Sequence, residues 1–319
     1  MNSKWDDIVR CINEAQRILI FTHANMDGDA MGSSQALCHV LRHMGKECYI
    51  LLEDDIPKYL DVLHEHDDFY VSKAPWKADL AAAVDCGDES RIEKRLDAYR
   101  DAKLRICVDH HIPKEDFADY SVVEPEAAAS GILIYELIKA LGAEIDKHIA
   151  EDLYAAISTD TGSFMYHNTD ARTHLVAADL YSYGIDHVKI CNAIYATFPL
   201  AQLRIEGRSL ENLQVFADGK AVISYITQDE IKGFGGTYEY ADTCIDRLRT
   251  IEGVEVACMI KENEEGEYKV SLRSKNYADV NAVAVIFGGG GHKMASGCTL
   301  RCDLQTAIEN LKAEIEKVI

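Results

Sequence analysis

The sequence lacks any run of about 18 or more apolar residues, which excludes a transmembrane helix of ordinary length. The stretch 1–16 is too polar for a secretory signal, so we expect a cytoplasmic protein without a membrane partner. Basic residues are also few: 33 Lys and Arg stand against 54 Asp and Glu, and the formal net charge is −21. Because binding to long nucleic acid relies on basic patches, this balance argues against a long duplex partner and leaves a short phosphorylated substrate open.

Paired cysteines are missing as well. The ten cysteines are scattered, several of them inside apolar runs, and none forms a CxxC pair. We therefore expect buried, reduced thiols rather than disulfides. No internal repeat, low-complexity segment or Gly/Ser-rich linker is evident. With 319 residues, 48% apolar and 27% charged, the sequence is that of a globular protein, and its length favours two domains.

The first part of the chain, residues 1–184, alternates strand and helix patterns. Apolar runs predict strands near 17–22, 47–52, 80–85 and 104–109, and helical spacing predicts helices near 30–44, 57–65, 91–100, 130–142 and 147–157. This alternation is typical of an α/β domain with a parallel sheet and helices on both faces.

The rest of the chain has a different pattern. Residues 185–215 are predicted to form a helical connection, interrupted by Pro199, and residues 216–319 a smaller α+β domain. Strands are expected at 221–226, 254–260 and 268–272, and helices at 238–250, 280–287 and 302–318. The acidic stretch 262–266 favours a turn, and hence a hairpin between the last two of these strands.

A dense polar cluster follows the first predicted strand. His23, Asp27 and Asp29 fall within seven residues, on a strand-to-helix turn where Gly28 permits a sharp bend. One imidazole and two carboxylates suit a divalent cation. The competing interpretation is that Asp27-Gly28 is only a turn and Asp29 only a helix cap.

The same pattern recurs at two further strand ends, where Asp85 ends one apolar run and Asp109-His110-His111 ends another. The carboxyl ends of parallel strands emerge at one edge of a sheet, so these residues predict a single metal site. Asp160 lies at the end of the helix predicted from Lys147, before a glycine stop. A lone aspartate there is more often a cap or a solvated acid, and only the neighbouring ligands make it a candidate.

Two features of the second domain suit phosphate binding. The run Gly288–Lys293, which includes Gly289, Gly290, Gly291 and His292, is predicted to be flexible, with backbone amides and positive charge available to a phosphate. Arg273 ends a strand and offers a planar guanidinium for a phosphate or a stacked base. Both signals are weak, because a glycine run is about as often a plain loop and such an arginine is usually solvated.

Taken together, these segments resemble the DHH phosphoesterases. The Asp109-His110-His111 triplet, the His23-x-x-x-Asp27-x-Asp29 cluster, Asp85 and the segment 160–164 match the family's N-terminal motifs in order and spacing, and 288–297 resembles the glycine-rich signature of the DHH-associated domain. Met26 stands where the family often has proline and Ala156 where it often has glycine; neither position supplies a ligand. The compact length is similar to that of the nanoRNases and pAp phosphatases.

The resemblance implies a role for each matched residue. One cation, expected to be Mn²⁺, would be held by His23, Asp27 and Asp85, and a second by Asp29, Asp85, His110 and Asp160, with Asp85 bridging. Two such cations can activate a water and clamp a phosphate. Asp109 would orient ligands and His111 would face the scissile phosphate. Arg273, Gly289, Gly290, Gly291 and His292 would hold the far phosphate or base of the substrate.

The function implied is manganese-dependent hydrolysis of short oligonucleotides, RNA preferred, to mononucleotides, or of 3′-phosphoadenosine 5′-phosphate (pAp) to AMP. A phosphodiesterase for cyclic or linear dinucleotides would use the same metal site and stays open. Inorganic pyrophosphatase fits the glycine-rich signature less well, and a long-strand exonuclease of the RecJ type is disfavoured by length. A non-catalytic nucleotide sensor is the alternative of another class. Relatives often dimerise through the first domain, so a homodimer is one expected state.

Overall fold

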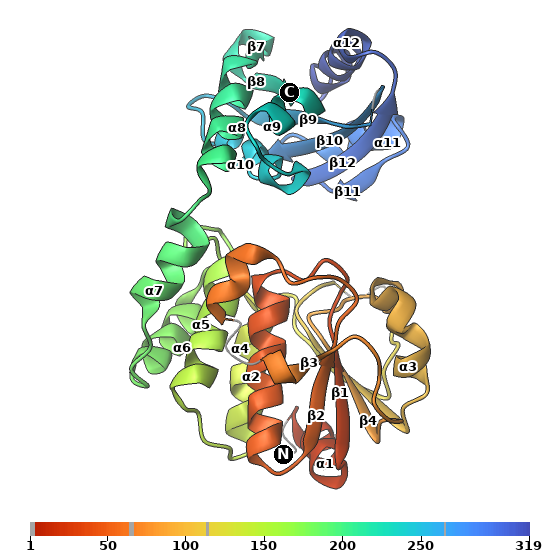
Figure 1. Cartoon of the computed structure of the whole chain (residues 1–319), viewed down its shortest axis with the longest axis vertical. Coiled ribbons are helices and arrows are strands. Elements are labelled where there is room, and N and C mark those ends of the chain that lie inside the picture. The colour runs from red at the N-terminus through yellow and green to blue at the C-terminus, as the bar shows by residue number, and fades with distance from the viewer. Residues whose placement is uncertain (1–3, 64–66, 113–114, 265) are drawn as a thin grey trace. The chain divides into compact units, whose positions relative to one another are not determined.

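The computed structural model describes residues 4–63, 67–112, 115–264 and 266–319 (Figure 1). The chain forms two compact units, Met1–Thr197 and Phe198–Ile319. The helical connection predicted for 185–215 is thus divided between them: α7 (His187–Cys191) and a π-helical turn (Asn192–Ala196) belong to the first unit, and α8 (Leu200–Glu211) to the second. Pro199 stands immediately before α8, where a missing backbone N–H costs nothing.

The first unit is built on a parallel sheet of six strands in the order β3-β2-β1-β4-β5-β6. Figure 1 labels the first four of them along the chain, β1 to β4. Its strands are β1 (Arg17–Phe21), β2 (Glu47–Leu51), β3 (Tyr70–Val71), β4 (Leu80–Val84), β5 (Leu104–Asp109) and β6 (Tyr120–Val123). The four strands predicted from apolar runs are confirmed. The other two, β3 and β6, lie at the edges of the sheet and are short, so they leave little apolar pattern in the sequence.

Both faces of this sheet are buried. Alternate side chains of β1 point to opposite faces: Ile18 and Ile20 belong to one apolar core, and Leu19 and Phe21 to another. Parallel sheets are covered in this way on both sides, which is why their strands are apolar throughout. The prediction of an α/β domain with helices on both faces is confirmed.

The helices of the first unit are α1 (Asp6–Glu14), α2 (Gly28–His43), α3 (Leu96–Arg100), α4 (Ser130–Ala140), α5 (Lys147–Asp160), α6 (Ala171–Tyr181) and α7. The helix predicted at 57–65 is the 3₁₀ helix η1 (Lys58–Leu63), and that at 91–100 is a 3₁₀ segment, η3 (Glu89–Arg95), followed by α3. No helix in the described part of the chain is long and apolar enough to cross a membrane.

Helices α2 and α5 pack closely against each other, and this contact positions the end of α5. A Cβ atom on Gly32 would lie 2.3 Å from the carbonyl oxygen of Asp152 and 3.0 Å from the Cβ of Ala156. Because backbone cannot yield at such distances, this approach requires glycine at position 32. The methyl of Ala156 therefore fits because the facing residue has no side chain.

The second unit contains a mixed sheet in the order β11-β12-β10-β9-β8-β7. Its strands are β7 (Gln214–Phe216), β8 (Ala221–Ile226), β9 (Val256–Glu264), β10 (Glu267–Ser274), β11 (Gly290–His292) and β12 (Ala295–Arg301). Its helices, besides α8, are α9 (Gln228–Gly233), α10 (Cys244–Arg249), α11 (Val280–Ile286) and α12 (Leu304–Ile315). The smaller α+β domain predicted from the sequence is confirmed.

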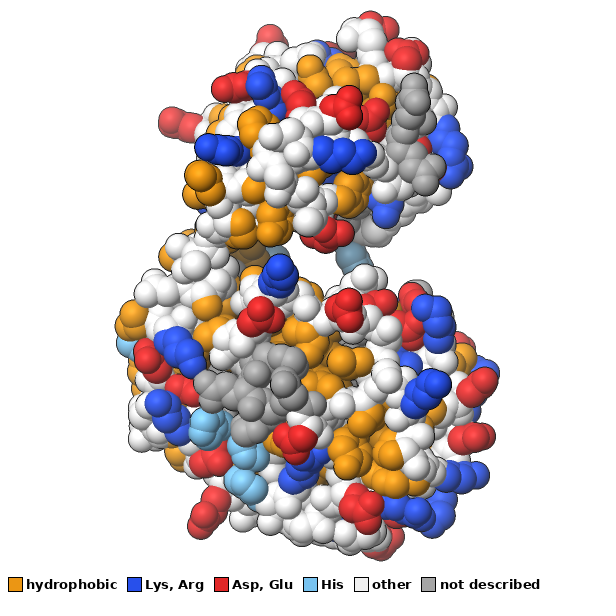
Figure 2. Space-filling view, viewed as in Figure 1, with side chains coloured by type: hydrophobic (Ala, Val, Ile, Leu, Met, Phe, Trp, Pro, Cys, Tyr) orange, Lys and Arg blue, Asp and Glu red, His pale blue; other side chains and the backbone are white. Residues whose placement is uncertain are grey.

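The predictions of a hairpin and of a flexible glycine run in the second unit are confirmed only in part. Strands β9 and β10 form the predicted antiparallel hairpin, but β9 extends through Glu264, so the predicted turn is shorter, and Glu265 lies outside the described residues. The prediction of a flexible glycine run was wrong for Gly290–His292, which pair with Ala295–Gly297 as strand β11. On the face drawn in Figure 2, acidic and basic side chains are interspersed rather than gathered into a basic stripe.

Candidate metal centre

The predicted ligands gather at the carboxyl edge of the parallel sheet, where the strand order reverses. Strands β1 and β4 are neighbours, and further strands extend the sheet away from them on either side. In open α/β sheets ligands bind at such points, because the loops that leave the two strands diverge. His23 follows β1, Asp85 follows β4 and Asp109 ends β5. The strand order therefore brings these segments together, as the sequence predicts.

The first group of possible ligands contains His23, Asp27 and Asp85. The Nε2 atom of His23 lies 3.5 Å from Oδ2 of Asp27 and 3.6 Å from Oδ2 of Asp85. The other ring nitrogen, Nδ1, lies 2.7 Å from the carbonyl oxygen of Ala24, an arrangement that orients metal-binding histidines. Asp27 caps α2 through Oδ1, which accepts a hydrogen bond from the amide of Ala30. Capping and metal binding are thus compatible, since each uses a different oxygen.

The second group contains Asp29, His110 and Asp160. The Nε2 atom of His110 lies 3.7 Å from Oδ2 of Asp29 and 3.4 Å from Oδ2 of Asp160. Its Nδ1 atom lies 3.1 Å from the carbonyl oxygen of Ala127. Asp29 is buried, and Asp160, the last residue of α5, is partly exposed. This arrangement leaves one nitrogen and at least two carboxylate oxygens facing a common point.

Asp85 faces both groups. Its Oδ2 atom is directed to His23, whereas its Oδ1 atom lies 3.5 Å from Nε2 of His110. The hydroxyl of Ser130 donates a hydrogen bond to Oδ1 at 2.9 Å. The φ angle of Asp85 is 54°, a left-handed conformation that costs a non-glycine residue energy and is often found at functional sites. A carboxylate with one oxygen toward each group has the geometry of a bridging ligand.

The remaining two predicted residues, Asp109 and His111, form a pair beside these groups. Nδ1 of His111 lies 2.8 Å from Oδ1 of Asp109 and 3.6 Å from Oδ1 of Asp85. The hydrogen bond with Asp109 raises the pKa of His111. Burial would raise the pKa of Asp109, but the hydrogen bonds with His111 and the charges of His111 and His110 together outweigh burial and lower that pKa. The buried carboxylate thus fixes the orientation of a partly exposed imidazole.

The two ligand groups concentrate carboxylates in a largely buried site, and this shifts the pKa values of several side chains. Burial raises the pKa of Asp29 well above its ordinary value, and Asp85 and Asp160 raise it further. Burial also raises the pKa of Asp160 to about 6. Burial alone would lower the pKa of His23, but its hydrogen bonds with Asp27 and Asp85 outweigh this and raise it to about 10. Burial and mutual repulsion therefore disfavour ionised carboxylates at Asp29 and Asp160 unless further positive charge lies nearby.

In the part of the chain that the structure describes, only histidines can supply that charge. Within the described residues, the ion pairs of Asp29, Asp85 and Asp160 are all with histidines, and none is with lysine or arginine. Imidazole nitrogens and carboxylate oxygens are ligands of first-row divalent metals. A divalent cation would offset the repulsion among the carboxylates. The donor set therefore fits divalent metal binding.

Two supports of this centre were not predicted from the sequence. Helix α4 has no side-chain cap at its N-terminus; instead the amides of Ser130 and Gly131 donate to the two oxygens of Asp29, at 2.6 and 2.9 Å. The free N–H groups and the dipole of a helix N-terminus favour a carboxylate there. The side-chain amide of Asn168 donates to the carbonyl oxygens of Ala128 and Asp160. The Ser-Gly pair at the start of the predicted helix 130–142 could have indicated a helix N-terminus open to a carboxylate. No sequence pattern indicated the role of Asn168.

Two of the predicted substrate-binding residues of the second unit, Arg273 and His292, lie on the two strands that flank β12. Arg273 of β10 and His292 of β11 are both in register with Ala295 of β12. Residues directly opposite one another share a face of the sheet, so Arg273 and His292 lie on the same face, about 10 Å apart by strand spacing. His292 is exposed and Arg273 is partly exposed. The fold thus places both on one accessible surface.

The glycines of this stretch also have structural reasons to be glycine. A Cβ atom on Gly289 would lie 2.1 Å from the carbonyl oxygen of Gly297, and one on Gly291 would lie 2.6 Å from that of Ala295. Gly291 also has a φ of 149°, which other residues rarely adopt. Close packing against β12 therefore accounts for two of the glycines without a ligand. Gly290 is exposed and has open space around it.

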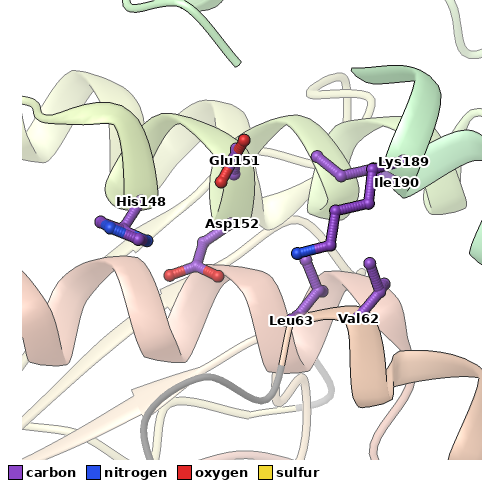
Figure 3. Close-up of a pocket in the computed structure, with 7 residues that line it drawn as sticks. All are labelled: Val62, Leu63, His148, Glu151, Asp152, Lys189 and Ile190. Atoms are coloured by element: carbon purple, nitrogen blue, oxygen red, sulfur yellow. The ribbon is translucent and has the colours of Figure 1, made fainter. Parts of the chain in front are cut away.

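A small pocket elsewhere in the first unit lies between η1, α5 and α7 (Figure 3). It is lined by Val62, Leu63, His148, Glu151, Asp152, Lys189 and Ile190. None of the predicted ligands lines this pocket, so it is not part of the metal centre.

Comparison with known families gives two matches along the chain. Residues 17–157 match the DHH family, N-terminal domain, and residues 218–319 match the DHHA1 domain. The first match contains all the predicted ligands except Asp160, and the second contains Arg273 and the glycine-rich strand.

Similar proteins are known across nearly the full length of the chain. It is 33% identical over 297 residues to the bifunctional oligoribonuclease and PAP phosphatase NrnA of Thermus thermophilus, covering 92% of this chain and 87% of the relative. It is 28% identical to the protein of the same name from Bacillus subtilis, covering 92% of each. The solved structure of an exopolyphosphatase-related protein from Bacteroides fragilis superposes with a TM-score of 0.92 at 27% identity, covering 98% of this chain and 96% of that one.

Proposed function

The chain belongs to the DHH family of phosphoesterases, and from this premise we propose that it hydrolyses short oligonucleotides to mononucleotides, and pAp to AMP, with two Mn²⁺ ions. Membership of the family makes the protein a metal-dependent phosphoester hydrolase. The choice of short RNA and pAp as substrates rests on the names of the relatives that match nearly the whole chain. The acidic composition agrees with a short substrate, because a long strand would need a basic surface.

The observation that carries this proposal is the position of Asp85. Its two oxygens face His23 and His110, the imidazoles of two separate ligand groups. We assign His23, Asp27 and Asp85 to one cation and Asp29, Asp85, His110 and Asp160 to the other. A carboxylate shared in this way would suit a pair of neighbouring cations.

When bound, such cations supply Lewis acids that activate a water and neutralise charge on the phosphate. The chain's own residues have complementary tasks. Asp109 holds the Nδ1 atom of His111 at 2.8 Å, which keeps the Nε2 atom of the ring available for the scissile phosphate. The amides of Ser130 and Gly131 fix Asp29, so that its oxygens stay in place as the charge at the site changes.

Substrate choice is assigned to the second unit. The guanidinium of Arg273 and the imidazole of His292 share one face of the sheet and suit a phosphate or a base at the far end of a short substrate. The backbone of Gly289, Gly290 and Gly291 adjoins this row and completes the proposed substrate surface. A variant Arg273→Ala is expected to raise the KM for dinucleotides with a smaller effect on kcat, because Arg273 is not among the residues assigned to the two cations.

Product analysis over one panel of substrates tests the proposal. The purified protein is incubated with Mn²⁺ and, separately, pAp, linear RNA di- to pentanucleotides, cyclic dinucleotides and pyrophosphate. We expect AMP and phosphate from pAp and mononucleotides from the short RNAs, with the cyclic substrates and pyrophosphate left intact. The catalytic-centre variant Asp27→Ala serves as the control and is expected to be inactive on all of them.

Two outcomes would overturn the assignment of substrate while leaving the family intact. Preferred opening of the cyclic dinucleotides would make the protein a cyclic-dinucleotide phosphodiesterase. Phosphate release from pyrophosphate, without release of nucleotides from dinucleotides, would make it a pyrophosphatase. Tight binding of a dinucleotide by the metal-loaded protein without turnover would instead indicate a sensor.

A further inference from the structure

A second cluster of metal-binding side chains lies in the first unit, away from the catalytic centre. His39 and His43 are four residues apart near the end of α2, and Asp146 is the N-cap residue of α5. Each of the three can place one ligand atom within 4.8 Å of the others. Nε2 of His39 lies 3.8 Å from Oδ2 of Asp146, and the rings of His39 and His43 are 4.5 Å apart between centroids. We call these three residues the distal cluster.

The distal cluster is separate from the residues assigned to catalysis. Asp29 lies in the first turn of α2, and His39 is ten residues further along the same helix. At 1.5 Å per residue this separation is about 15 Å along the helix axis. The distal cluster therefore belongs to the opposite end of α2 and shares no residue with the two ligand groups of the catalytic centre.

The chemistry of the distal cluster suits a transition metal. Two histidines at positions i and i+4 lie on one face of a helix, a spacing used to hold zinc. Two imidazoles and one carboxylate form a donor set that zinc, nickel and copper accept more readily than magnesium or calcium do. Asp146 uses Oδ1 to cap α5, through the amide of Ile149 at 2.9 Å, and directs Oδ2 to His39.

The three side chains differ in freedom in a way that favours metal capture. His39 is buried at 8% exposure and packs edge-on against the ring of Phe69, so its position is set by the fold. His43 is exposed, so its ring can turn toward an ion that arrives from solution, and the partly exposed Asp146 offers Oδ2 while its Oδ1 caps α5. Figure 2 shows histidine side chains gathered beside acidic ones on the surface of the first unit.

A further imidazole stands next to the distal cluster. The ring of His148, which lines the small pocket between η1, α5 and α7, lies 6.2 Å from the ring of His39. Figure 3 shows His148 and Asp152 on the side of α5 that faces α2. His148 therefore places a third imidazole close to the distal cluster.

We propose that His39, His43 and Asp146 bind one divalent transition-metal ion, with Zn²⁺ the best match, and that this ion joins the end of α2 to the start of α5. An ion that binds the folded state alone stabilises it by mass action. The ion is structural, because no residue assigned to catalysis contacts the distal cluster. This inference does not depend on which phosphoester the protein hydrolyses.

Metal counting tests the proposal. The whole protein is dialysed to equilibrium against buffered Zn²⁺, and bound zinc is measured by elemental analysis for wild type, His43→Ala and Asp146→Asn. The second change keeps a good helix cap while removing the carboxylate. Both variants are expected to bind one equivalent less than wild type and to keep full Mn²⁺-dependent hydrolysis. The matched control His187→Ala, on α7, is expected to bind as much zinc as wild type.

A stability measurement in a background with a disabled catalytic centre supplies a second readout. Zn²⁺ is expected to raise the thermal midpoint of Asp85→Asn by about 3 °C or more, and to leave that of Asp85→Asn/His43→Ala unchanged. Equal zinc content in wild type and His43→Ala, together with equal thermal shifts in the two backgrounds, would show that the distal cluster is only packed imidazoles and would overturn the proposal.

Discussion

Aspartates in opposite electrostatic states lie near the two ends of the strands in the parallel sheet, one at the amino ends and one at the carboxyl ends. At the amino edge, Asp79 accepts hydrogen bonds from Lys103 and from the backbone amides of Arg17 and Gln16, and these contacts lower its pKa to about 2. At the carboxyl edge, burial raises the pKa of Asp160 to about 6. One carboxylate beside the sheet is thus stabilised as an anion, whereas another, at the end of α5, resists ionisation.

The comparison distinguishes a carboxylate that stabilises the fold from carboxylates that belong to the metal centre. Asp79 is neutralised by a lysine and by amides of the chain itself, so it needs nothing from solution. The carboxylates of Asp29, Asp85 and Asp160 have only histidines as ion-pair partners among the described residues, so they remain short of positive charge. Clustered carboxylates that the fold leaves without lysine or arginine partners are typical of sites that bind cations.

The largest effect is expected from removing the shared ligand. Asp85→Asn should lower Mn²⁺-dependent hydrolysis of short RNA by more than about 100-fold, because even residues that only support metal ligands are worth 10- to 100-fold. Steady-state rates against Mn²⁺ concentration give the measurement. Asp79→Asn, at the other edge, is the control and should keep near wild-type activity; an equal loss in both variants would contradict the distinction between the edges.

A smaller effect is expected from loosening a support of that ligand. Ser130→Ala removes the hydroxyl that donates to Oδ1 of Asp85, and it should raise the Mn²⁺ concentration for half-maximal activity by about 10-fold. The exposed Ser182, whose hydroxyl bonds only to backbone of its own helix, supplies the matched control Ser182→Ala. Activity of Ser130→Ala at saturating Mn²⁺ should return close to wild type, and failure to recover would assign the serine another role.

The raised pKa of Asp160 predicts how the metal-free protein responds to pH. A carboxylate whose folded pKa is raised contributes stability below its ordinary value near 3.8, and that contribution is lost as pH rises through about 6. Metal-free wild type should therefore lose on the order of 1 kcal/mol relative to Asp160→Asn between pH 4 and pH 7. Urea unfolding of both proteins in chelator measures this difference, and added Mn²⁺ at pH 7 should restore the wild type.

Asp79 should show the opposite dependence, with the smallest effect of the four. Its lowered pKa contributes stability above about 3.8, which is lost as pH falls toward about 2. Asp79→Asn should destabilise the protein near neutral pH and have little effect at pH 2. Acid unfolding followed by circular dichroism tests this, with Asp97→Asn on the exposed side of α3 as the control. A gap between Asp79→Asn and wild type that is constant with pH would mean that charge plays no part.

Much of the first unit could be predicted because parallel strands buried on both faces are apolar throughout. Their carboxyl ends had to meet, which brought His23, Asp85 and Asp109 to one edge. Short edge strands such as β3 and β6 could not be predicted, since they bury too few residues to leave a pattern.

Contacts that depend on tertiary packing were beyond the sequence. The amide groups of Ser130 and Gly131 hold Asp29 across a separation of about a hundred residues, and Asn168 acts through two carbonyl oxygens. The strand β11 could not be predicted from the glycine run, because glycine has little strand preference. It is the pairing with β12 that makes Gly290–His292 a strand. The distal cluster was likewise invisible, because Asp146 reaches α2 only through the packing of α5.

The most direct test of the account is an anomalous difference map at the manganese absorption edge, from crystals grown with Mn²⁺. We predict two peaks at the carboxyl edge of the parallel sheet: one among His23, Asp27 and Asp85, and one among Asp29, Asp85, His110 and Asp160. Both peaks should contact Asp85. A single peak, or two peaks that do not share Asp85, would contradict the proposed two-cation centre.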